Sequence, residues 1–153
     1  MSFDVEYIDV DAIPVSHPVQ QFHQFWQQLP KDQGIATWND KLISVVPEIV
    51  PWMSMLVAAK AGRYLIRFCG ASFEQMIGRN HQGLHLDEAL PEAVMPDRLK
   101  ELANIAAGNG PLFSKTMLPF KNKETIGVYR GVFGFSTTSD EIDRFALVIA
   151  PKT

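Results

Sequence analysis

Residues 63–90 read RYLIRFCGASFEQMIGRNHQGLHLDEAL, and the spacing of their apolar side chains changes at Gly70. Over 63–69 the apolar residues alternate with others, which predicts a strand with one face turned into a core. Over 71–77 they recur at helical spacing, and Gly78 stands where a residue in the left-handed conformation commonly ends a helix. This stretch therefore predicts a strand followed at once by a short helix.

The segment after that helix carries a family resemblance. The strand ends in RFCGA at 67–71, and GRNHQGLHLDEAL at 78–90 forms a polar turn bracketed by glycines before an apolar pattern resumes. Together these segments resemble the bacterial PAS-like family, in its stand-alone and mostly alphaproteobacterial form. The order of elements extends the resemblance from about Trp38 to the C-terminus. The matching residues are Arg67, Gly70, Ala71, Gly78, Arg79, Asn80, Gly83, Leu86, Asp87, Glu88 and Leu90.

The resemblance implies an α+β fold. We expect a PAS-like five-stranded antiparallel sheet with short helices on one face and an extra N-terminal helix. It also implies a non-catalytic sensory or interaction module in bacterial signal transduction. It transfers no ligand, because Asn80, His81, Gln82 and His85 depart from the residues common in the family. The ligand and any cofactor therefore stay unknown.

Composition narrows the class of protein. A chain of 153 residues suits one hydrophobic core. Its formal net charge of −3 provides no broad basic field, so we expect no nucleic-acid partner. Cys69 is the only cysteine, which excludes an internal disulfide and thiolate zinc clusters and favours a reducing compartment.

The N-terminal residues do not resemble a signal peptide. Residues 1–17 are acidic and irregular in pattern, without a basic start or an apolar run. No segment approaches the roughly 20 apolar residues that span a bilayer. We therefore expect a cytoplasmic protein with no membrane partner.

An amphipathic helix is predicted from Pro18 to Leu29. Its apolar stripe consists of Phe22, Phe25, Trp26 and Leu29, and glutamines occupy the other side. The stripe must dock on another surface, because such a helix is not stable alone in water. That surface is either the sheet of the same chain or a second copy, and the second option makes a homodimer. We divide the chain into a leader with this helix, 1–37, and a PAS-like domain, 38–153.

Two nearly continuous apolar runs, 52–59 and 144–150, predict strands that are covered on both faces. We place them as neighbours in the middle of the sheet, as the PAS topology implies. Pro119 cannot donate to a strand ladder, so its strand should lie at an edge or end there. The other predicted elements are a helix from Pro96 to the glycines at 108–110, strands at 112–120, 126–136 and 142–151, and polar turns at 121–125 and 137–141.

A small pocket is expected between the helices and the sheet. Two arginines in predicted strands, Arg67 and Arg130, must reach solvent, pair with a carboxylate or hold an anionic ligand. If a carboxylate ligand binds, these two are the candidates, because a guanidinium grips a carboxylate through two bonds. The candidate ligand-binding residues are Phe68, Met76, Leu99, Phe113, Met117, Tyr129, Arg130 and Arg67, with Leu102 and Val132 also bounding the pocket.

His81 and His85 are four residues apart, a spacing that suits a shared metal on one helical face. Gly83 between them disfavours that helix, and no further ligand completes a metal set, so we assign no metal site. Cys69 is interpreted as an inert, partly buried thiol.

The main interpretation is a non-catalytic module that binds a small ligand, a signalling protein partner, or both, and forms a homodimer. One alternative is a ligand-free dimerisation scaffold. Another is a small α+β enzyme that uses His81 or His85 as a base. The enzyme requires a carboxylate partner that the sequence does not place, so no catalytic residue is assigned.

Overall fold

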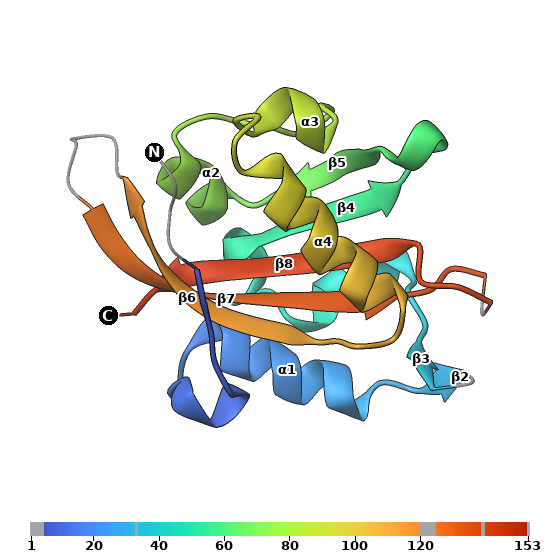
Figure 1. Cartoon of the computed structure of the whole chain (residues 1–153). Coiled ribbons are helices and arrows are strands. Elements are labelled where there is room, and N and C mark those ends of the chain that lie inside the picture. The colour runs from blue at the N-terminus through green and yellow to red at the C-terminus, as the bar shows by residue number, and fades with distance from the viewer. Residues whose placement is uncertain (1–4, 33, 120–124, 139, 153) are drawn as a thin grey trace.

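The computed structural model describes residues 5–32, 34–119, 125–138 and 140–152. Within these residues the centre is a six-stranded antiparallel sheet in the order β1-β6-β7-β8-β4-β5 (Figure 1). Its strands are β1 (Glu6–Tyr7), β4 (Met53–Ala58), β5 (Tyr64–Cys69), β6 (Leu112–Pro119), β7 (Thr125–Phe135) and β8 (Arg144–Pro151). The α-helices are α1 (Pro18–Gln28), α2 (Ala71–Ile77), α3 (Leu86–Ala89) and α4 (Met95–Ala106), and a separate two-stranded ladder joins β2 (Lys31–Asp32) to β3 (Ile35–Ala36).

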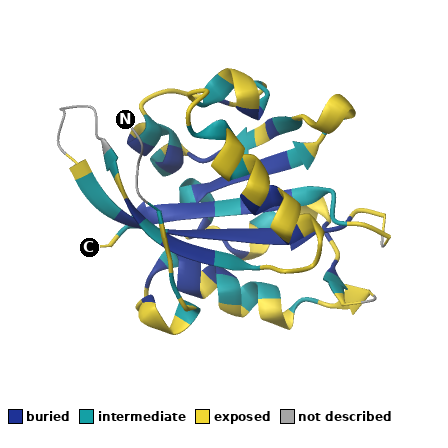
Figure 2. Cartoon of the chain, in the orientation of Figure 1, coloured by how far each residue is buried: buried dark blue, intermediate teal, exposed yellow. Residues whose placement is uncertain are grey.

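The two long apolar runs lie side by side, as predicted. β4 pairs with β8 through a register that sets Met55 opposite Ala146, and both strands are in the middle of the sheet. Their central position explains the continuous apolar pattern, since layers of side chains cover both faces. Figure 2 shows these strands mostly buried.

The prediction of five strands and an irregular leader is wrong at the N-terminus. Glu6 and Tyr7 form a sixth strand on the outer edge of β6. An ion pair of 2.9 Å between Glu6 and Lys115 and a backbone bond of 3.0 Å from Ile8 N to Phe113 O hold it there. A strand of two residues is too short to show a periodicity, so no sequence pattern predicts it.

The sheet presents different residues to its two faces, because successive side chains of a strand point in opposite directions. Along β7, Val128 and Val132 belong to two clusters on the side of α2, α3 and α4, whereas Phe133 and Phe135 pack with α1. The helices therefore cover both faces, with α1 on the side opposite α4 (Figure 1).

Helix α1 docks on the sheet of its own chain, which was one of the two surfaces predicted for its stripe. Pro18 occupies the first turn, where its missing N–H is not needed. Phe22 is fully buried and its ring lies 4.8 Å from that of Phe133. Trp26 donates its Nε1–H to the carbonyl of Gly134 at 3.1 Å.

A β-bulge interrupts β5. Met55 opposes Phe68 and Leu56 opposes Ile66, so Arg67 is an extra residue without a partner in β4. A bulge reverses the alternation beyond it. Phe68 consequently packs with the α1 side of the core, whereas Ile66 faces the opposite side. The regular alternation predicted over 63–69 is therefore wrong after Ile66.

The turn at 78–90 folds back along the free edge of β5. Gly78 ends α2 in the left-handed conformation, with φ of 97°, as predicted. Gly83 N donates to Ile66 O, and Ile66 N donates to Leu84 O, each at 2.8 Å. The predicted turn at 121–125 lies, except for Thr125, outside the described residues.

Candidate ligand-binding cavity

A cavity of about 400 Å³ lies between the sheet and helices α2, α3 and α4. This volume falls within the range of small-molecule sites. Apolar side chains form most of the wall. They come from Val5, Leu56, Ile66, Phe73, Met76, Ile77, Leu86, Ala89, Leu90, Pro91, Ala93, Val94, Leu102, Leu118, Val132, Leu147 and Ile149.

A buried ion pair forms the polar part of the wall. Arg130 of β7 donates Nη1–H and Nη2–H to the two carboxylate oxygens of Glu101 on α4, at 3.1 and 2.9 Å. It also donates to Ser114 Oγ at 2.8 Å. Both charged residues are 4% exposed, and the two parallel bonds offset the cost of removing the charges from water.

Tyr7 of β1 completes the bonding of Glu101. Its hydroxyl donates to Glu101 Oε2 at 2.7 Å. Burial, followed by this bond to the carboxylate, raises the pKa of Tyr7 to about 12. Burial acts to raise the pKa of Glu101, but the hydrogen bonds and charge of Arg130, with Tyr7 and Arg98, outweigh it and hold that pKa below its usual value. Glu101 is thus ionised and fully engaged at neutral pH.

Arg98 lies one turn before Glu101 on α4. Its Nε is 3.1 Å from Glu101 Oε1, with a geometry that is not a hydrogen bond, and this buried nitrogen has no hydrogen-bond partner within the described residues. The side chain is 19% exposed and lines the cavity. Burial, and then the charge of Arg130, lower the pKa of Arg98.

Further polar residues line other parts of the cavity. They are Ser54, Arg79, His81, Asp97 and Thr116. Arg79 and Asp97 are exposed, so they lie where the cavity meets solvent. His81 is 6% exposed, and burial together with the charge of Arg79 lowers its pKa, which leaves the imidazole neutral at pH 7.

The structure places some predicted site residues in this wall. Met76 and Arg130 line the cavity, as do Leu102 and Val132. Three situations were expected for an arginine in a strand: reaching solvent, pairing with a carboxylate or holding an anionic ligand. Arg130 pairs with a carboxylate, that of the buried Glu101. Whether any of these residues binds a ligand stays a prediction.

Six other candidates do not line this cavity. Phe113 and Tyr129 lie on the face of the sheet that α1 covers, and the bulge places Phe68 on the same face. Arg67 is exposed within the bulge. Leu99 and Met117 are 39% and 48% exposed, because each lies on the outward side of its element.

The sequence pattern missed Glu101, Arg98 and Tyr7. The spacing of the apolar residues in α4 predicts that Arg98 and Glu101 lie on its solvated side, yet Glu101 is buried. Arg130 was a signal for Glu101 alone, since a charge in a central strand requires a carboxylate from the layer that covers it. No signal in the sequence identified Tyr7.

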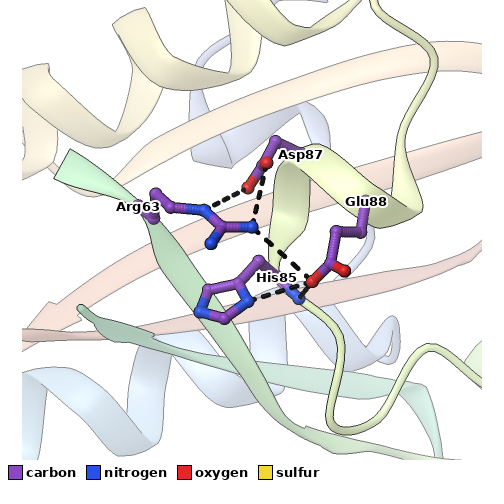
Figure 3. Close-up of polar contacts among 4 residues, drawn as sticks. All are labelled: Arg63, His85, Asp87 and Glu88. Carbon is purple, nitrogen blue, oxygen red and sulfur yellow. Dashed lines mark hydrogen bonds and ion pairs between the residues drawn. The ribbon is translucent and has the colours of Figure 1, made fainter. Parts of the chain in front are cut away.

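His85 lies outside the cavity, in a surface network. Its Nδ1 and backbone N–H both contact Glu88 Oε1, at 3.0 and 2.9 Å. Arg63, which directly precedes β5, binds Asp87 through two bonds of 3.1 Å and lies 3.6 Å from Glu88 (Figure 3). The network joins α3 to β5, and its carboxylates have lowered pKa values, chiefly through Arg63 for Asp87 and through the His85 backbone for Glu88.

The two histidines do not form a metal site in the part of the chain that the structure describes, where no group of three potential metal ligands occurs. Cys69 is buried, and burial raises the pKa of its thiol, although a backbone hydrogen bond at His81 acts in the opposite direction. A protonated buried thiol is a poor nucleophile.

No protein-family model matches the chain, and no curated protein matches its sequence. Its fold does match solved structures. The PAS domain of Bordetella pertussis BvgS is 21% identical, with a TM-score of 0.54 over 75% of this chain and 88% of that one. A sensory box histidine kinase/response regulator from Burkholderia thailandensis is 10% identical over 73% of this chain and 84% of that one, with a TM-score of 0.43.

An RNA-binding light-oxygen-voltage receptor is also similar, with 10% identity and a TM-score of 0.53. The match covers 98% of this chain but 39% of the receptor. Together with the BvgS domain it establishes a PAS-like α+β fold, as predicted, whereas the alphaproteobacterial type stays a prediction. Among the described residues, no helix has the length and apolar character to cross a membrane.

Proposed function

We propose that this PAS-like domain is a non-catalytic sensory module of bacterial signal transduction that binds a small ligand in the cavity beneath α4. The observation that carries the proposal is the cavity itself. An apolar space of about 400 Å³ with a few fixed polar groups is the usual form of a small-molecule site.

The polar wall supports a mechanism of population shift. Glu101 bonds to Arg130 in the sheet and to Tyr7 in β1, so one side chain joins the cavity wall, the sheet and the N-terminal strand. A ligand that fits one arrangement of α4 better than another favours that arrangement, and β1 follows through Tyr7. A signalling protein that contacts α4 or β1 then receives the change.

The positions of the histidines disfavour the enzyme. His85 has a carboxylate neighbour, Glu88, but neither residue lines the cavity. His81 lines the cavity, yet no carboxylate bonds its ring within the described residues. Neither histidine therefore combines a base, a partner that orients it and a substrate space.

The ligand-free scaffold and the homodimer are tested by native mass spectrometry of freshly purified protein. We expect a retained small molecule, and the same spectrum gives the number of subunits. The apolar stripe of α1 does not call for a second copy, because it packs against the sheet of its own chain.

A cavity-filling variant provides the second arm of the test. Val132→Phe adds bulk from the floor of the cavity, whereas Leu99→Phe adds similar bulk to the exposed side of α4. We expect Val132→Phe to lose the retained molecule and Leu99→Phe to keep it, with both variants folded by circular dichroism. Wild-type protein without a bound molecule, and without a thermal shift on addition of cell metabolites, would argue for the scaffold.

A further inference from the structure

The carboxylate in the cavity wall has no capacity left for a ligand. Glu101 accepts two bonds from Arg130 and one from Tyr7, and Arg98 lies against its remaining side. A cationic ligand would have to break one of these bonds to reach it. The ion pair therefore does not favour a positively charged molecule.

Positive charge, in contrast, is in excess. Arg130 is used by Glu101 and Ser114, whereas the side chain of Arg98 makes no hydrogen bond within the described residues and its Nε is buried. Arg79 adds a second cation at the rim. The opposing charge is Asp97, which is exposed and therefore screened by solvent, and His81 is neutral.

Unused donors next to an apolar space select for a particular ligand. A buried N–H without a partner costs free energy, and an ionised acceptor recovers it through a charge-assisted hydrogen bond. The rest of the wall is apolar and favours a hydrocarbon body.

We infer that the ligand is a carboxylic acid with an apolar body, whose acid group is bound by Arg98, with Arg79 adding positive charge at the rim. The arginine that recognises the acid is thus neither of the two indicated by the sequence, because Arg130 is engaged and Arg67 is outside the cavity. This inference rests on the proposed function, since it identifies the ligand class of the same cavity.

The test compares octanoate with octanol, which share a flexible apolar chain and differ in the acid group. Calorimetric titration of wild-type protein is expected to show octanoate binding at least about tenfold more tightly, the effect of one charged hydrogen bond. Arg98→Met removes the charge and keeps the apolar stem. We expect it to weaken octanoate binding about tenfold and to leave octanol binding within about twofold.

Lys100→Ala is the matched control. It removes one positive charge from an exposed position of α4 that does not line the cavity, and both titrations should be unchanged. Glu101 keeps Arg130 and Tyr7 in the Arg98→Met variant, so the fold should persist, and the wild-type comparison of the two probes needs no variant.

The possible outcomes separate the two proposals. Equal binding of octanoate and octanol, or an equal loss of both in Arg98→Met, overturns the ligand class and leaves the sensory module intact. An equal loss of octanoate binding in Lys100→Ala would also overturn it, since general charge would then explain the preference. Binding of neither probe, with no retained molecule in native mass spectra, overturns both proposals.

Discussion

Glu101 is the residue on which the buried charges depend. Replacing it with leucine leaves Arg130 buried without its counter-charge, and we expect a loss of about 3–5 kcal/mol in the free energy of unfolding. Urea denaturation measures this change. The double variant Arg130→Met, Glu101→Leu removes both charges and should recover part of the loss.

The exposed pair Glu6–Lys115 is the matched control for that measurement. Its side chains are 65% and 40% exposed, so Lys115→Ala should leave the urea midpoint nearly unchanged. A double variant no more stable than Glu101→Leu alone would contradict our account of Arg130.

His17 couples the fold to pH. As the N-cap of α1, it accepts a bond from Val19 N at Nδ1, and its Nε2 donates to the carbonyl of Ala150 at 3.1 Å. This bonding requires the neutral ring, and burial lowers the pKa of His17 below 6.5. The neutral ring is therefore fully stabilising above pH 6.5, and stability falls as the pH drops below that value toward the folded-state pKa.

We expect His17→Asn to keep the capping acceptor and to reduce the fall in unfolding midpoint across pH 6.5. Thermal melts on both sides of that pH measure it, with Gln21→Asn on the exposed side of α1 as the control. His23 and His81 also have pKa values lowered by burial, so part of the slope should remain. If the unfolding midpoint of His17→Asn changes with pH as steeply as that of the wild type, His17 is not a source of the pH dependence.

At the level of the elements, the junction of β5 and α2 depends on a close approach of two backbones. A Cβ on Gly70 would overlap the carbonyl oxygens of Val50 and Pro51, and Gly70 N donates to Met53 O at 2.8 Å. We expect Gly70→Ala to cost roughly 1–3 kcal/mol, because a backbone cannot move aside as a side chain can.

Gly127→Ala is the control for a glycine in a strand. Its added Cβ would meet only the flexible ends of Lys152 and Met117, the nearest atom at 3.2 Å. Chemical denaturation should therefore separate the two substitutions clearly. Similar losses for both would mean that strand propensity, and not the overlap at Gly70, sets the cost.

Elements in which the apolar spacing repeats several times were predictable from the sequence, and short or irregular elements were not. The spacing in α1 and α2 and the apolar runs of β4 and β8 each reflect several residues on one buried face. The strand β1 has two residues, and the bulge at Arg67 is one extra residue, so neither produces a repeating pattern in the sequence. That single insertion removed Phe68 from the predicted pocket.

The candidate site was predictable in position but only partly in its residues. The charge of Arg130 within a predicted strand indicated that a carboxylate partner exists. That this partner is Glu101 depends on how α4 is rotated about its axis over the sheet, and the polar residues of α4 do not specify this rotation. The division of the chain at residue 37 stays a prediction.

For the whole molecule, we expect stability to decrease from the centre of the sheet to its β1 edge. The amides of β4 and β8 lie between paired strands, whereas Ile8 N depends on a single bond beside a two-residue strand. Native-state hydrogen exchange should thus release Ile8 long before β4 and β8. Octanoate should slow the exchange of Ile8, because Val5 lines the cavity. Equal protection throughout the sheet would show that β1 opens only with global unfolding.

The alternation along the strands has a consequence for engineering. Along β7, Arg130 and Val132 line the cavity, whereas Tyr129, Phe133 and Phe135 pack on the side of α1, so the two sets are subject to separate constraints. A combinatorial library at Val132, Leu147 and Ile149 would diversify recognition while every aromatic anchor of the opposite layer stays untouched. The scaffold is accordingly suited to conversion into a reporter for small molecules chosen by the designer.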